Sequence, residues 1–153
     1  MSYKKVLVAV DLTEESDQVL AKAKHVAEQD GAQVSLVHVV KPIEHVYGGF
    51  GAVGLAGDFS AQMATLEQQA VSHAQEQLAK MGKDIGAASD KQFVQVGSAS
   101  REIHRLAEEE DIDLIVIGNH GRHGLGRLLG STANGVLHGA GCDVLTVRVA
   151  LED

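Results

Sequence analysis

Apolar residues follow two patterns along this chain, short continuous runs and longer segments with helical spacing. Continuous runs are typical of strands that are buried on both faces, and recurrence at every third or fourth position is typical of amphipathic helices. The runs predict strands at 6–10, 34–40, 93–96, 114–117 and 144–149. The segments between them predict helices around 13–31, 63–81, 98–107 and 132–138.

Helix and strand ends are predicted from individual polar, glycine and proline residues. Thr13 is predicted as the N-cap of the first helix, and Gly31 is predicted to end it. Pro42 is predicted to close the second strand. Residues 43–60 are rich in glycine and predict a long mobile loop or lid, because structureless segments of this length are uncommon in compact domains unless they are functional or poorly ordered.

Strands and helices alternate throughout the 153 residues, which predicts an α/β fold in one domain spanning 1–153. Strands that are apolar on both faces predict a doubly wound, Rossmann-like parallel sheet between two layers of helices. In such sheets ligands bind beyond the carboxyl ends of the strands, where the winding direction reverses. Asp11 ends the first strand and a glycine-rich segment follows the fourth, so the two features meet if these strands are neighbours.

The glycine-rich segment 118–132 lies between the fourth predicted strand and the fourth predicted helix. Glycine lets backbone N–H groups approach a ligand closely, and a helix N-terminus offers unpaired N–H donors with a partial positive charge. Cationic or donor side chains lie in the same segment, although the chain has a net charge of −8: His120, Arg122, His123 and Arg127. The pattern indicates a phosphate site, with a tight turn that needs glycine only for its geometry as the alternative.

Composition argues against several other functions. The net charge of −8 and the 3% aromatic content, without Trp, argue against nucleic acid as a partner, because such binding needs a basic face or stacking platforms. The only cysteine, Cys142, cannot form an internal disulfide and is expected to be an apolar filler. Neither a signal peptide nor an apolar run of the ~20 residues that span a bilayer is evident, so we expect a cytoplasmic protein without membrane insertion.

Three common nucleotide-binding patterns do not match the sequence. A P-loop ends in Gly-Lys-Ser or Gly-Lys-Thr. Here Gly130-Ser131 has Leu129 beside it and no lysine. A dinucleotide fingerprint places glycines after the first strand, where residues 11–14 contain none. A receiver domain would carry acidic residues at the ends of the first and third strands, and the third ends in Val96-Gly97.

Five motifs remain, and they occur in order over essentially the whole chain. They are Val8-Ala9-Val10-Asp11 with the nearby Ser16, then Val37-His38-Val39, then Asp113-Leu114-Ile115-Val116-Ile117-Gly118-Asn119-His120-Gly121-Arg122, then Gly130-Ser131-Thr132-Ala133, and finally Cys142-Asp143-Val144-Leu145-Thr146-Val147-Arg148. Together they resemble the universal stress protein family, whereas any single motif would be unspecific.

The resemblance implies an adenine-nucleotide α-hydrolase-like fold with strand order 3-2-1-4-5 and a homodimer paired through the fifth strands, here Val144 to Val149. It also implies that ATP, ADP or AMP binds with Mg²⁺ in the crevice where the winding reverses. By matching position, Asp11 would face the ribose and the metal, and the backbone of Val39 would meet the adenine. Residues at or beside the matching positions are Ala9, Val10, Asp11, Val39, Ile117, Gly118, Asn119, His120, Gly121, Arg122, Gly130, Ser131 and Thr132.

The sequence departs from the family pattern at one point. Residues 122–129 separate Gly121 from Gly130, one fewer than the family's usual nine. Asp11 also has a structural alternative, since an aspartate after a strand commonly caps the following turn. His38, inside a predicted strand, is expected to be a packed, hydrogen-bonded residue rather than a ligand.

Three functions follow from these observations. The first is a nucleotide-binding regulatory protein whose dimer surface reports nucleotide occupancy to an unidentified protein partner. The second is a slow ATP hydrolase or autophosphorylating enzyme, although no convincing general base is evident. The third is a nucleotide-free dimeric interaction module in which the glycines only shape a turn.

Overall fold

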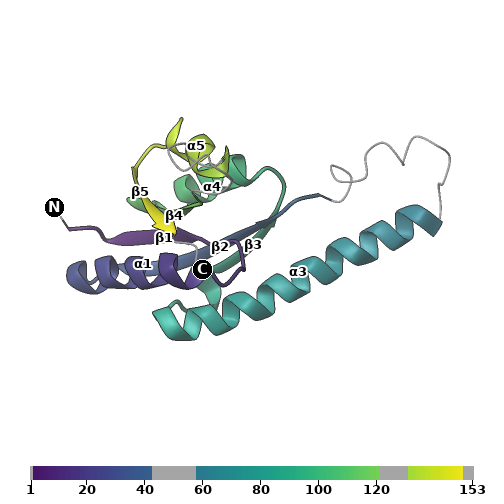
Figure 1. Ribbon diagram of the computed structural model, residues 1–153, viewed down its shortest axis with the longest axis horizontal. Helices are drawn as coiled ribbons and strands as arrows, with labels where there is room; N and C mark the ends of the chain where they lie inside the picture. The colour runs from purple at the N-terminus through teal and green to yellow at the C-terminus, as the bar shows by residue number, and fades with distance from the viewer. Residues whose placement is uncertain (1, 43–57, 121–130, 150–153) are drawn as a thin grey trace.

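The computed structural model describes residues 2–42, 58–120 and 131–149, and within them it shows an α/β fold (Figure 1). Five parallel strands form one sheet in the order β3-β2-β1-β4-β5, which confirms both the predicted fold class and the strand order. The strands are β1 (Lys5–Ala9), β2 (Gln33–Val40), β3 (Gln92–Val96), β4 (Leu114–His120) and β5 (Asp143–Val149). The helices are α1 (Ser16–Asp30), α3 (Asp58–Ile85), the 3₁₀ turn η2 (Ser89–Lys91), α4 (Ala99–Glu109) and α5 (Ser131–Leu137).

Two layers of helices cover the sheet, with α1 and α3 on one face and α4 and α5 on the other (Figure 1). Alternate residues of β1 enter the two cores: Val6 and Val8 pack with α1 and α3, and Leu7 packs with α4 and α5. All three are fully buried. Because both faces are covered, the strands need apolar residues at consecutive positions, which explains the continuous runs in the sequence.

Strand β4 is longer than its apolar run predicts. It continues through Gly118, Asn119 and His120, which pair with Val147, Arg148 and Val149 of β5. The prediction that the glycine-rich loop begins at Gly118 is therefore wrong. The neighbouring strand supplies backbone partners along this stretch, so the ladder continues although the side chains are no longer apolar.

Helix α1 begins later than predicted. Its N-cap is Glu15, not Thr13, because the N–H and hydroxyl of Thr13 both bond to the side chain of Asp11. At the other end Gly31 has φ 65° and its N–H bonds to the carbonyl of Ala27, as expected for a glycine that ends a helix.

Helix α3 begins at Asp58, so residues 58–60 of the predicted loop belong to a helix, and residues 43–57 lie outside the described residues. Its apolar stripe packs on the sheet only over its second half, where Ala74 and Leu78 are buried and Met81 packs against the core. The first half extends beyond the sheet (Figure 1), and Leu66 is 45% exposed there. Periodicity correctly predicts the helix but not where the sheet beneath it ends.

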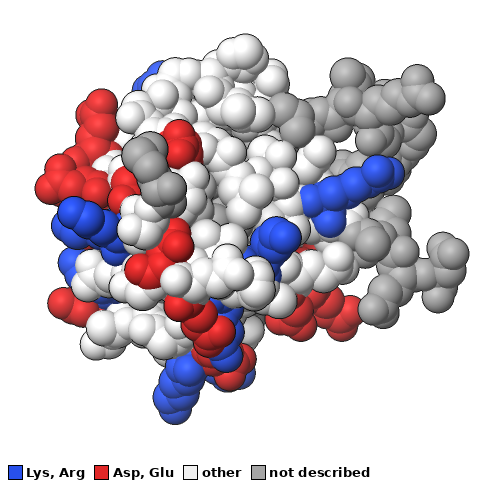
Figure 2. Space-filling view, turned by 90° about the vertical axis from the view of Figure 1, so that its left-hand side faces the viewer, with Lys and Arg blue, Asp and Glu red and all other residues white. Residues whose placement is uncertain are grey.

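The surface charges are mixed in sign. Figure 2, which views the left-hand side of Figure 1, shows Lys and Arg interspersed with Asp and Glu. Lys91 pairs with Glu110 at 3.2 Å, and Arg105 pairs with both Glu102 and Glu109 on α4. The view does not show the basic face that binding to a nucleic-acid backbone requires. Among the described helices, none combines the length and apolar character needed to cross a membrane.

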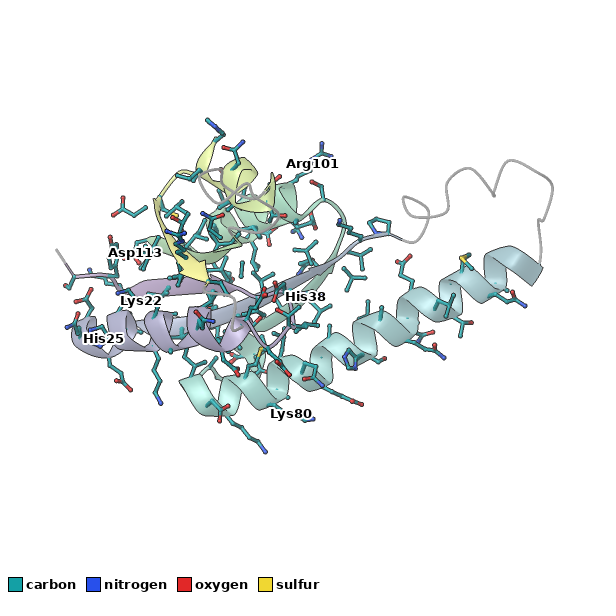
Figure 3. All side chains as sticks on the ribbon, in the orientation of Figure 1. Lys22, His25, His38, Lys80, Arg101 and Asp113 are labelled. Carbon is teal, nitrogen blue, oxygen red and sulfur yellow. The ribbon has the colours of Figure 1, made fainter. Side chains whose placement is uncertain are left out.

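Asp113 ties the beginnings of β1 and β4 together. Its carboxylate accepts hydrogen bonds from the backbone N–H groups of Lys4 at 2.8 Å and Lys5 at 2.9 Å. In Figure 3 it lies at the opposite end of the sheet from His38. These bonds help set the register in which Val6 faces Leu114.

We expect Asp113→Ala to lower the free energy of unfolding by about 1–3 kcal/mol, because it removes the acceptor of the partly buried N–H of Lys5 as well as that of the exposed N–H of Lys4. Chemical denaturation monitored by circular dichroism measures the change. Asp84→Ala on the exposed side of α3 is the control, and a surface change of this kind should stay within about 0.5 kcal/mol. Equal stability of the two variants would contradict the role given to Asp113.

Candidate functional site

A cavity of about 640 Å³ lies at the carboxyl ends of β1, β2 and β4. The chain winds outward from β1 to β2 and β3 and then returns to form β4 on the other side of β1. The helices that follow these strands therefore lie on opposite faces of the sheet and diverge, which opens a crevice at this end. The volume lies within the range of about 300–1,000 Å³ that small-molecule sites occupy.

Seven of the predicted site residues line this cavity. They are Ala9, Val10, Asp11, Val39, Ile117, Gly118 and Thr132. Asn119 and His120 continue β4, and Ser131 begins α5. Gly121, Arg122 and Gly130 lie outside the described residues. The fold thus brings residues from three predicted strand ends and one predicted helix to the same crevice, and their roles in binding stay a prediction.

Asp11 accepts three hydrogen bonds at one carboxylate oxygen, Oδ1. The donors are the N–H of Thr13 at 3.1 Å, the hydroxyl of Thr13 at 2.7 Å and the hydroxyl of Ser16 at 2.8 Å. The structural alternative for Asp11, capping of the turn after the first strand, is therefore confirmed. Because the residue also lines the cavity, capping does not exclude a second contact with a ligand.

The turn between Asp11 and Thr13 contains a strained backbone. Leu12 has φ 65°, in the left-handed region that costs a leucine roughly 1–2 kcal/mol. Leu12 lies between Asp11 and Thr13, whose N–H and hydroxyl both reach the carboxylate of Asp11. The leucine side chain packs against the core beneath α1, which offsets part of the cost. Strain that persists beside a cavity is typical of functional sites.

His38 is hydrogen-bonded as predicted, and it also lines the cavity. Its Nδ1 lies 2.8 Å from the carbonyl oxygen of Val10. A carbonyl can only accept, so Nδ1 carries the proton and donates. The ring bridges the ends of β1 and β2 near the middle of the molecule (Figure 3). The sequence analysis expected the hydrogen bond but did not place His38 beside the cavity.

The sequence analysis missed several other lining residues. Lys41 directly follows β2, and Glu15 directly precedes α1. The rule that sites form at the carboxyl ends of strands would have found both residues. His73 and Ala70 reach the cavity from α3. These two stand in an ordinary helical stripe, so no signal in the sequence distinguishes them from core positions.

Cys142 does not belong to the site. It packs against the core beneath α4 and α5, and burial, followed by the charges of Asp143 and Asp113, raises the pKa of its thiol. A thiol with a raised pKa is a poor nucleophile at neutral pH. This agrees with the expected role as a filler.

The described residues contain no group of three or more His, Cys, Asp or Glu side chains that could hold a metal ion by themselves. Mg²⁺ commonly binds through one or two carboxylates, water and the phosphates of its substrate. Asp11 at the cavity edge fits a cation that arrives with a nucleotide, with the carboxylate as its protein ligand. A closed cage of protein ligands is not needed for that chemistry.

The model of the universal stress protein family matches residues 2–148. This span includes β1 to β4, all of β5 except Val149, and every residue that lines the cavity. The chain belongs to the universal stress protein family. Universal stress protein A homolog 2 of Coxiella burnetii is 41% identical over 149 residues, covering 97% of each chain.

Solved structures of the family share the fold. A universal stress protein in complex with cAMP has a TM-score of 0.64 and 24% identity, and the match covers 98% of this chain and 100% of that one. The universal stress protein of Archaeoglobus fulgidus in complex with dAMP has a TM-score of 0.55 and 22% identity, with 96% and 99% covered. At these identities the likeness shows the fold alone.

Gly118 lies where α1 and β5 approach the edge of the cavity. A Cβ at this position would lie 2.9 Å from Cγ2 of Val19 and 3.3 Å from Cγ2 of Val149, and both valines are buried. We expect Gly118→Ala to lower the free energy of unfolding by about 1–3 kcal/mol, the usual cost of overpacking. Thermal unfolding measures it. Gly141→Ala, whose Cβ would meet nothing within 4 Å, is the control and should be nearly neutral.

Proposed function

We propose that this universal stress protein is a regulatory protein that binds an adenine nucleotide, ATP, ADP or AMP, with Mg²⁺. The observation that carries the proposal is the cavity at the carboxyl ends of β1, β2 and β4, with Asp11 on its rim. This is where parallel α/β sheets bind their ligands. Family membership and the two relatives described in complex with cAMP and dAMP support an adenine nucleotide as the ligand.

In this proposal three groups of residues contact different parts of the nucleotide. The backbone of Val39 at the end of β2 faces the adenine, and Asp11 faces the ribose and the cation. Gly118 and Thr132 adjoin the ribose and phosphates, since glycine permits close approach and the hydroxyl offers a hydrogen bond. The remaining phosphate contacts come from the glycine-rich segment, with Asn119, His120, Gly121, Arg122, Gly130 and Ser131 as candidates.

Mg·ATP at about 100 times its Kd should stabilise the protein by about 2.7 kcal/mol. For a domain of this size that raises the Tm by roughly 5–10 °C. Asp11→Asn should weaken Mg·ATP binding by roughly tenfold or more in isothermal titration calorimetry, because hydrogen bonds to a charged group contribute about 1.5–3 kcal/mol.

GTP at the same concentration is the control ligand, and it should shift the Tm far less if Val39 reads the adenine. The absence of any shift with ATP, ADP and AMP would contradict the proposal and favour a nucleotide-free interaction module. Equal shifts with ATP and GTP would contradict selectivity for adenine.

We also propose that two copies pair through β5. This strand forms one edge of the sheet, and an edge strand leaves backbone N–H and C=O groups available to another chain. Residues Val144 to Val147 are only half-buried in the single chain. A second copy would extend the sheet and cover them.

Light scattering should therefore give the mass of two chains. Thr146→Lys on β5 should give the mass of one chain, because pairing would bring two cations together at the interface. Val96→Lys on β3, at the opposite edge, is the matched control and should remain a dimer. A one-chain mass for the unmodified protein at every concentration would refute pairing through β5.

A further inference from the structure

The buried serine at the start of α1 is the feature that carries a further inference. Ser16 is 2% exposed and lines the cavity, and its hydroxyl lies 2.8 Å from Oδ1 of Asp11. Few serines are buried this deeply unless the hydroxyl is hydrogen-bonded, because an unpaired buried hydroxyl is costly. Ser16 therefore fixes the position of the carboxylate from within the protein, where water does not compete.

Thr13 holds the same oxygen from the solvent side. Its N–H and hydroxyl lie 3.1 and 2.7 Å from Oδ1, so that oxygen accepts from an exposed residue as well as from the buried Ser16. The left-handed backbone at Leu12 makes this arrangement possible. Thr13, which follows the strained Leu12, and the buried Ser16 thus donate to the same carboxylate oxygen at the rim of the cavity.

Hydrogen bonds of this kind have a known consequence where a carboxylate binds a cation. The partners that orient a ligating side chain determine how well it meets the ion, and removing them typically lowers metal affinity by about 10–100-fold. An oriented carboxylate is ready to bind, whereas one that rotates freely must first be ordered.

We propose that Ser16 and Thr13 are positioning residues that orient the Asp11 carboxylate toward a divalent cation, so that the cavity prefers a nucleotide carrying the cation over the same nucleotide without it. This inference rests on the proposed function. It adds that Ser16 and Thr13, which act through Asp11, determine the preference for the cation complex.

The test measures the Kd of ATP with excess Mg²⁺ and with EDTA, by titration calorimetry, and compares their ratio between variants. Ser16→Ala and Thr13→Val should each lower the preference for Mg·ATP, Ser16→Ala by roughly tenfold, because the affinity falls more with Mg²⁺ than with EDTA. Thr13→Ser keeps the hydroxyl and should behave as the unmodified protein. Ser35→Ala removes a buried hydroxyl from β2, away from the cavity, and should also leave the ratio unchanged.

A double-mutant cycle separates positioning from general destabilisation. If Ser16 acts through Asp11, Ser16→Ala should change the ratio no further once Asp11→Asn is present. An additional loss in that background would overturn the proposal, as would a ratio that falls with Asp11→Asn but not with Ser16→Ala and Thr13→Val. Equal weakening in Mg²⁺ and EDTA would show a purely structural role and would overturn it too.

The same data keep this inference distinct from the proposed function. If ATP binds equally well with Mg²⁺ and EDTA, the positioning role is refuted while nucleotide binding stands. If the unmodified protein does not bind ATP, ADP or AMP at all, the proposed function itself is refuted and the inference with it.

Discussion

The pairing of β1 with β2 on one side and β4 on the other is the constraint on which the rest of the structure depends. β1 is the central strand, and Val6, Leu7 and Val8 are fully buried in cores on both faces. A parallel neighbour on each side requires crossovers that run over both faces of the sheet. The helices then separate beyond the carboxyl end of β1, and the cavity lies in the gap that they leave.

This constraint explains why residues far apart in the sequence meet. Asp11 follows β1, Val39 lies near the end of β2, and Gly118 lies in β4, so parallel pairing places all three at one end of the sheet. The opposite end is fixed by a different carboxylate, since Asp113 accepts the backbone N–H groups that precede β1. The sheet therefore has one end that sets register and another that is left open for a ligand.

The strand pattern was predictable because burial on both faces demands uninterrupted apolar runs. Gly31 was predictable because its left-handed backbone favours glycine. The end of β4 could not be predicted, because the strand pairing at Asn119 depends on the neighbouring strand and not on side-chain polarity. The exposure of Leu66 could not be predicted either, because helical spacing says nothing about where the sheet beneath the helix ends. Likewise His73 reaches the cavity only because of how α3 lies across the sheet.

The turn at Asp11 shows why a structural and a functional interpretation of one residue need not compete. Thr13 and Ser16 donate to Oδ1, and this closes the turn that leads into α1. The same bonds keep the carboxylate at the cavity rim in a single orientation. Leu12 adopts a backbone conformation that a leucine rarely accepts, and a turn required only to connect a strand to a helix has less strained solutions. The strain is understandable if the turn is also required to hold a charged group in place beside the cavity.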